Sequence, residues 1–142
     1  MPEFHIRSFQ PDDEASVISL WQRCDLTRPW NNPAKDIHRK LQIWPEGFLV
    51  GLLDGEIIAS LMVGYEGHRG WFNYLAVDPA HQRRGHARRL IEHAERLLLA
   101  AGCPKINLQI RSSNSAVIDF YRRLGYAVDE VTSMGKRLQP DD

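Results

Sequence analysis

The chain of 142 residues lacks several features that would direct it to a specialised class of protein. Its two cysteines, Cys24 and Cys103, are far apart, which indicates reduced packing residues and not a disulfide framework. No apolar run approaches the roughly 18 residues of a membrane span, and Met1-Pro2-Glu3 lacks the pattern of a signal peptide. We therefore expect a cytoplasmic protein without a membrane partner.

Net charge is also absent, because 18 basic residues balance 18 acidic ones. A neutral chain is not steered to nucleic acid, so no nucleic-acid partner is expected. The six histidines and two cysteines show no zinc spacing, and we expect no metal. With 43% hydrophobic and 25% charged residues, the composition is typical of a single globular domain over residues 1–142.

The most informative stretch that is present runs from Leu75 to Ala87. Its first five residues indicate a strand that Pro79 ends, and after Gly85 the apolar residues recur at helical spacing. Such a helix start offers free backbone N–H groups and the positive end of a dipole to a phosphate, and Gly85 permits close approach. Charge-assisted bonds to that phosphate are available from nearby arginines: Arg83, Arg84 and Arg88.

The same arginines, with Arg89, also fit an exposed helix face or a nucleic-acid patch. The run has no interleaved aromatic residues and the chain is neutral, so phosphate binding explains it better.

Turn signals and periodicity divide the remaining chain into alternating elements. The strands at 71–77 and 105–111 are separated by one helix, so we expect parallel neighbours in a right-handed crossover. The order predicts an α/β (α+β) fold whose sheet is mixed but mostly antiparallel. The expected strands lie at 4–9, 47–53, 56–65, 71–77, 105–111, 127–131 and 134–138, and the expected helices at 11–24, 34–43, 86–101 and 115–124.

Two motifs carry a resemblance to a known family. Gln82-Arg83-Arg84-Gly85-His86-Ala87, after Ala-Val-Asp-Pro, resembles the acetyl-CoA signature of the GCN5-related N-acetyltransferases (GNATs). The second GNAT signature is found at Asn114 and Phe120-Tyr121-x-x-Leu124-Gly125-Tyr126. The resemblance covers essentially the whole chain, and implies the GNAT fold: six to seven strands, four helices and a parallel pair at the acyl-CoA cleft. The segments at 23–26, 28–31, 67–70 and 134–138 are similar to those of small bacterial YpeA-type acetyltransferases.

The resemblance implies an acetyl-CoA-dependent N-acetyltransferase that moves an acetyl group to a primary amine by direct attack in a ternary complex. The acceptor class stays open among protein lysines, protein α-amines and small-molecule amines. The alternative is a non-catalytic acyl-CoA-binding module, acting as a sensor or regulatory subunit. The sequence does not decide the oligomeric state, and a homodimer is one alternative.

The resemblance also implies which residues contact the acyl-CoA. The pantetheine arm enters a gap where the 71–77 and 105–111 strands splay apart, and the phosphates lie on the loop before the helix. The expected contacts are Leu75, Ala76, Val77, Gln82, Arg83, Arg84, Gly85, His86, Ala87, Arg88, Asn114 and Tyr121.

Tyr121 is the expected general acid, because a phenol with a pKa of about 10 is protonated at neutral pH and can donate to the departing sulfur. The alternative is that Tyr121 only belongs to the apolar stripe of its helix. Asn114 binds pantetheine or caps that helix, and the two roles are compatible.

The general base is left open. Relatives that acetylate protein N-termini often carry a glutamate where this chain has Gln109, and an amide cannot accept a proton at neutral pH. The candidates are Glu66 and His68, although a solvated turn histidine is an equal reading of His68. A water chain held by Asn73, Tyr74 and Gln109 is the third.

The acceptor site is expected under the loop that joins the first two helices. This loop supplies Arg28, Trp30 and Asn31, and Asn73 and Gln109 complete the expected set. Trp30 has an equal alternative role in packing the loop against the core.

Overall fold

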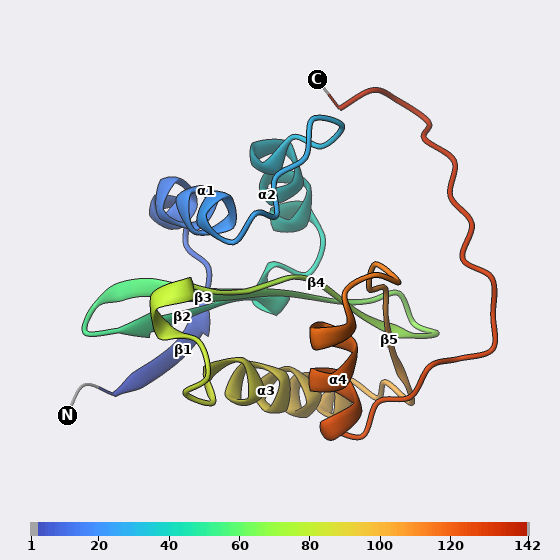
Figure 1. The fold of residues 1–142 in the computed structure, drawn as a ribbon. Helices are drawn as coiled ribbons and strands as arrows, with labels where there is room; N and C mark the ends of the chain where they lie inside the picture. The colour runs from blue at the N-terminus through green and yellow to red at the C-terminus, as the bar shows by residue number, and fades with distance from the viewer. Residues whose placement is uncertain (1–2, 142) are drawn as a thin grey trace.

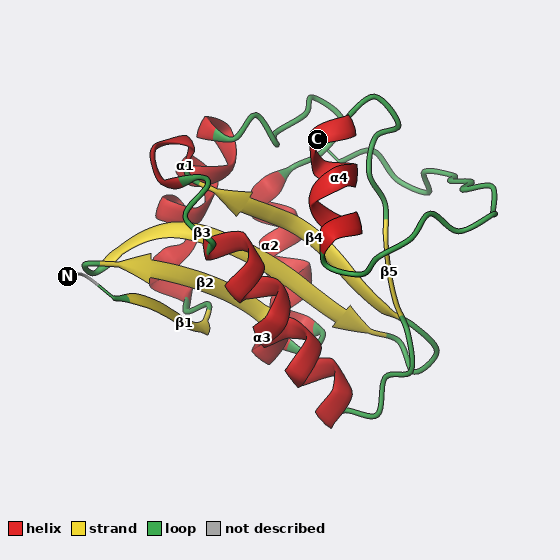
Figure 2. Ribbon diagram, turned by 60° about the horizontal axis from the view of Figure 1, so that its bottom comes forward, coloured by secondary structure: helices red, strands yellow, loops and turns green. Residues whose placement is uncertain are grey.

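A computed structural model describes residues 3–141 of the chain as one five-stranded sheet between two layers of helices (Figure 1). Helices α1 and α2 cover one face, and α3 and α4 cover the other (Figure 2). No helix of the described part is long and apolar enough to cross a bilayer. The elements are β1 (Phe4–Ser8), α1 (Glu14–Arg23), α2 (Pro33–Gln42), β2 (Phe48–Leu53), β3 (Glu56–Tyr65), β4 (Gly70–Val77), α3 (His86–Ala100), β5 (Ile106–Leu108) and α4 (Ser115–Arg123).

The strands lie in the sheet in chain order, β1-β2-β3-β4-β5. The first four are antiparallel neighbours, and β2 and β3 are joined by Asp54 and Gly55, both with positive φ as a two-residue hairpin turn requires. β4 and β5 are parallel, as the crossover rule predicts, with α3 as the connection. The mixed sheet with a parallel pair is therefore confirmed.

The core has two parts, one on each face of the sheet. Under α3, the inward stripe Leu90, Ile91, Ala94 and Leu98 packs on β2, β3 and β4. Under α1 and α2, Trp21 and Phe48 join Val17, Leu20 and Ile37 in the second part. All nine of these side chains are at most 1% exposed, so both layers of helices are fixed to the sheet by buried apolar area.

The expected count of six to seven strands is wrong, because the sheet has five and the segments 127–131 and 134–138 form none. The described tail after α4 runs away from the sheet and ends beside α2 (Figure 1). Side chains hold it, through Lys105 with Asp129 at 2.7 Å and Gln109 with Ser133 at 2.5 Å. β5 is only three residues long and offers a short edge for pairing. The apolar residues of the tail are left exposed: Val128, Val131, Met134 and Leu138.

Candidate active site

A β-bulge interrupts β4 in its second half. Asn73 is opposite Met62 and Ala76 is opposite Ser60, so Tyr74 and Leu75 together face one residue of β3. Tyr74 has φ = 53°, a left-handed conformation that is uncommon for an aromatic residue. Bulges and strained residues of this kind re-aim side chains and are frequent beside functional sites.

The ladder between β4 and β5 ends early, at the pair Phe72 and Leu108. Beyond this pair the two strands part, and a cleft of about 780 Å³ lies between them. Its walls are polar and apolar in similar parts, and they come from the α1–α2 loop, α2, β3, β4, β5 with the segment after it, and α4. The lining residues are Cys24, Asp25, Leu26, Arg28, Asn31, Asp36, Met62, Phe72, Asn73, Tyr74, Leu75, Leu108, Gln109, Ile110, Arg111, Asn114, Val117 and Tyr121.

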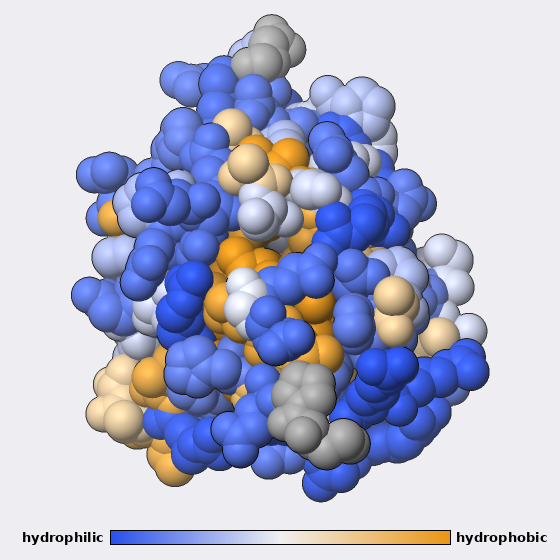
Figure 3. Space-filling view, turned by 90° about the vertical axis from the view of Figure 1, so that its left-hand side faces the viewer, coloured by the Kyte–Doolittle hydropathy of each residue, from blue (hydrophilic) through white to orange (hydrophobic). Residues whose placement is uncertain are grey.

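Figure 3 shows the face at the left of Figure 1, which carries the turn between β2 and β3 and the loop that follows β4. Apolar surface gathers near the centre of this face among hydrophilic residues.

Tyr121 is part of the cleft wall. Its ring packs edge-on against Phe120 and Tyr126, with centroids 5.1 and 5.3 Å away, and only 5% of the residue is exposed. Burial raises the pKa of the phenol above its ordinary value, so the hydroxyl remains a proton donor across the neutral range. The residue is thus in the apolar stripe of α4 and also borders the cleft.

The loop after β4 leaves the start of α3 open. Arg83 and Gly85 both have positive φ, 64° and 81°, and no side chain caps the first backbone N–H groups of α3. An added Cβ at Gly85 would meet no atom within 4 Å, so the space in front of this helix start is clear. Exposed N–H groups at a helix start form an anion site.

Three side chains of this loop and of the first turn of α3 already have partners within the protein or pack against it. Gln82 donates to the carbonyl of Val77 at 3.1 Å, and Arg88 pairs with Glu92 at 2.8 Å. His86 stacks on Phe4 with ring centroids 4.3 Å apart, and both its buried ring nitrogens lack a partner among the described residues. Burial lowers the pKa of His86, so the imidazole is neutral at pH 7 and packs as an uncharged ring.

Eight of the residues expected from the sequence line the cleft together: Arg28, Asn31, Asn73, Tyr74, Leu75, Gln109, Asn114 and Tyr121. Ala76 and Val77 lie further along β4, and residues 82–88 form the end of the adjoining loop and the first turn of α3; neither group is in the lining. Trp30 is also outside the lining. Its ring is half exposed and stands under the guanidinium of Arg111, whose Cζ is 5.8 Å from the ring centroid.

Glu66 and His68 are not brought into the cleft. Both are exposed in the turn between β3 and β4, at the start of β4, whereas the cleft lies towards its end. The Glu66 carboxylate accepts hydrogen bonds from the backbone N–H groups of His68 and Arg69, mainly the latter, which lower its pKa. This carboxylate therefore stabilises its own turn.

The structure adds a carboxylate that sequence reasoning missed. Asp36 lies on α2 and reaches the cleft, where its Oδ2 accepts a 2.6 Å hydrogen bond from the Tyr74 hydroxyl. Nothing in the sequence relates these two residues, because 38 positions separate them and Asp36 has the ordinary place of an acidic residue in the first turn of a helix.

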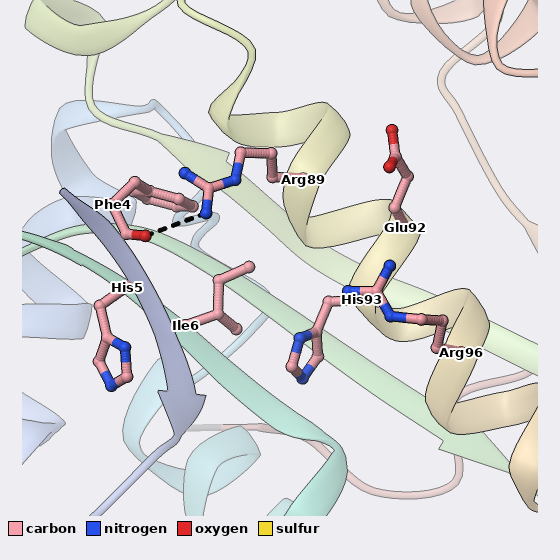
Figure 4. Close-up of a pocket in the computed structure, with 7 residues that line it drawn as sticks. All are labelled: Phe4, His5, Ile6, Arg89, Glu92, His93 and Arg96. Atoms are coloured by element: carbon pink, nitrogen blue, oxygen red, sulfur yellow. Dashed lines mark hydrogen bonds between the residues drawn. The ribbon is translucent and has the colours of Figure 1, made fainter.

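A second cavity, of about 250 Å³, lies between β1 and α3 (Figure 4). The Arg89 guanidinium covers it, donating to the Phe4 carbonyl at 3.2 Å and lying 5.2 Å from the Phe4 ring centroid. None of the residues that the sequence singled out as contacts lines this cavity. We therefore take the larger cleft as the candidate active site.

The sheet that opens between two parallel strands, with a glycine loop before α3, is the fold of known acetyltransferases. The ribosomal-protein-S18-alanine N-acetyltransferase of Escherichia coli superposes with a TM-score of 0.72 at 25% identity, covering 87% of this chain and 77% of that one. The aminoglycoside N-acetyltransferase AAC(6')-Iy, solved in complex with CoA, has a TM-score of 0.76 at 18% identity, covering 98% and 97%.

The sequence comparisons give the family. The model of the "Acetyltransferase (GNAT) family" matches residues 15–126. An acetyltransferase of Sodalis glossinidius is 52% identical over 137 residues, which are 96% of each chain. This chain therefore belongs to the GNAT family of acetyltransferases, as its two motifs indicated.

Proposed function

We propose that this acetyltransferase is an acetyl-CoA-dependent N-acetyltransferase, and that it transfers the acetyl group to a primary amine by direct attack in a ternary complex. The observation that carries the proposal is the cleft between β4 and β5 with Tyr121 in its wall. Support also comes from two proteins of the same fold, since both are N-acetyltransferases and the structure of one of them contains CoA.

The residues present fit an acyl-CoA. The open start of α3, with Gly85 at its N-cap and exposed Arg83 and Arg84, suits the pyrophosphate. The cleft suits the pantetheine arm, which lies along the bulged part of β4. Because the bulge leaves one residue of β4 without a direct partner, a backbone N–H at Tyr74 or Leu75 is suited to bond the thioester oxygen.

Tyr121 then acts as the general acid. The phenol lies on the α4 side of the cleft and donates its proton to the sulfur as the carbon–sulfur bond breaks. A module that only binds acyl-CoA has no use for a proton donor at this place, so the residue separates the proposed enzyme from a non-catalytic sensor.

The first test is the melting temperature of the purified chain with acetyl-CoA, with dephospho-CoA and ATP as controls. A ligand at about 100 times its dissociation constant adds roughly 2.7 kcal/mol, which raises the melting temperature by several degrees. Release of CoA thiol is then measured with a panel of amines. Absence of a shift at millimolar acetyl-CoA contradicts the donor, and a shift without turnover on any amine supports the binding module instead.

A further inference from the structure

The cleft is lined by two carboxylates in different settings. Asp25 is almost fully exposed, with 94% of its side chain accessible, and its partner Arg28 is 3.5 Å away. Asp36 is sheltered, with 25% of its side chain accessible, and it accepts the short hydrogen bond from Tyr74. Asp36 is thus the carboxylate that the fold holds in a defined position on the cleft wall.

Three contacts hold Tyr74 in place. Its ring stacks on Trp21 with centroids 3.9 Å apart, and its carbonyl accepts a 2.9 Å hydrogen bond from the buried hydroxyl of Ser60. Because its hydroxyl donates to Asp36, the lone pairs of that oxygen are left to accept from a group in the cleft. Burial and the bond to Asp36 raise the pKa of Tyr74, so the phenol is neutral at pH 7 and can only relay a proton.

Resting on the N-acetyltransferase function proposed above, we infer that Tyr74 and Asp36 take the first proton of the acceptor ammonium. One N–H bond of the ammonium breaks as the Tyr74 oxygen gains that proton, and the proton that Tyr74 held passes to Asp36 Oδ2. Asp36 later releases it to solvent. This relay supplies the base that the sequence left open, and Asp36 acts in it through Tyr74.

The other protons of the acetyl transfer are accounted for as follows. The freed nitrogen lone pair attacks the thioester carbon, the carbon–sulfur bond breaks, and Tyr121 donates its proton to the sulfur. The nitrogen loses a second proton when the amide forms, and this proton replaces the one that Tyr121 gave. The net reaction releases CoA thiol, the acetylated amine and one proton.

Other charged groups face the pair from several elements. Arg39 on α2 lies 3.0 Å from Asp36 and 2.5 Å from Asp141 of the tail, so one guanidinium bridges the two carboxylates. Asp25 and Arg28 line the same cleft from the α1–α2 loop. Variants of Asp36 therefore need a control that removes a cleft carboxylate without touching Tyr74, and Asp25 provides it.

The test compares Asp36→Asn, Tyr74→Phe and Asp25→Asn in the full chain, with acetyl-CoA and an amine that the wild type accepts. Loss of general-base catalysis lowers kcat/KM by about 100-fold or more at pH 7, and we expect this for Asp36→Asn and Tyr74→Phe. The deficit shrinks as the pH approaches the pKa of the amine, because the substrate then arrives already deprotonated. Asp25→Asn is expected to lose less activity than Asp36→Asn at pH 7, and its deficit should not depend on the pKa of the amine, because Asp25 pairs with Arg28 and not with Tyr74.

Several outcomes overturn the relay. One is an Asp36→Asn deficit no larger than that of Asp25→Asn, and another is a deficit constant with pH, which marks a structural role. Normal turnover of Tyr74→Phe beside an impaired Asp36→Asn removes Tyr74 from the path.

The fold of each variant is checked by its thermal shift with acetyl-CoA. If Asp36→Asn lacks the shift, Asp36→Glu, which keeps a carboxylate, takes its place. The relay then predicts that the profile of kcat/KM against pH for Asp36→Glu is displaced from that of the wild type. A wild type inactive on every amine removes the proposed function and the relay together. A wild type that is active beside an unimpaired Asp36→Asn removes the relay alone.

Discussion

The indole ring of Trp21 lies stacked on the phenol ring of Tyr74, with centroids 3.9 Å apart and planes 14° apart. Trp21 Nε1 donates to the Ser60 hydroxyl at 2.8 Å, and Ser60 donates to the Tyr74 carbonyl at 2.9 Å. The contact therefore joins α1, β3 and the bulge of β4. It explains how a tyrosine with a left-handed backbone is tolerated at the edge of the cleft, since the ring stack and the hydrogen bond to its carbonyl together hold it in place.

Replacing Ser60 with alanine removes the hydroxyl that satisfies two buried groups. An unsatisfied buried polar group costs about 1–3 kcal/mol, so we expect Ser60→Ala to lower the free energy of unfolding by at least that amount. Urea denaturation measures it. Ser113→Ala, on an exposed turn, is the control and should change stability by less than about 0.5 kcal/mol. Equal stability of the two variants contradicts the role given to Ser60.

Replacing Tyr121 with phenylalanine keeps the ring and removes the proton donor. We expect kcat to fall by about 10²–10⁴-fold, the range that general acid catalysis contributes, while the thermal shift with acetyl-CoA is kept. Tyr126→Phe is the matched control, because that phenol packs on Tyr121 but donates to Glu95 at 2.8 Å. Its turnover should remain. Wild-type turnover of Tyr121→Phe leaves the acid unassigned.

Gly85 and Gly55 are matched positions for a comparison of two alanine substitutions. They have nearly the same backbone, φ = 81° and 79°, and neither would bring an added Cβ within 4 Å of another atom. Alanine at either site costs about 1–2 kcal/mol of backbone strain. Only Gly85→Ala should also weaken acetyl-CoA binding, measured by calorimetry, because it changes the loop before α3. Equal affinities of the two variants argue against a phosphate site there.

Arg7 and Asp13 form a two-pronged ion pair, with bonds of 2.7 and 3.1 Å, that holds β1 to the turn before α1. The Arg7 hydrogen bond lowers the pKa of Asp13 in the folded chain. Between this lowered pKa and the ordinary pKa of the unfolded chain, the unfolded chain therefore binds more protons than the folded one. The stability from this pair is fully present above the ordinary carboxyl pKa of about 3.9 and is lost as the pH falls through the lowered folded value.

The pair therefore predicts a pH-dependent difference. Asp13→Asn should destabilise the chain by about 1–3 kcal/mol at pH 7, and the difference from the wild type should narrow towards pH 3. Urea unfolding at several pH values measures it. Asp12→Asn is the control, since Asp12 is exposed in the same turn. A difference that stays constant with pH shows that charge is not its source.

Local patterns predicted most of the fold because their signals lie within a few residues. The apolar stretch from Glu56 to Tyr65 and the Asp54-Gly55 turn predicted the hairpin that β2 and β3 form. The apolar stripe at helical spacing after Gly85 predicted α3 and the side of this helix that packs on the sheet. Prediction failed at the tail, where short apolar stretches resemble strands but follow an edge strand, β5, that is only three residues long.

For the candidate site, the residues that the sequence alone predicted belong to motifs: the loop before α3, Asn114 and Tyr121. A motif is a local arrangement of backbone and side chains, so it can be read from spacing. The tertiary structure alone decided that Glu66 stays at its own turn and that Asp36, on another helix, meets Tyr74. That meeting depends on the bulge of β4 and on α1 and α2 packing over the sheet, which are long-range contacts that no local period encodes.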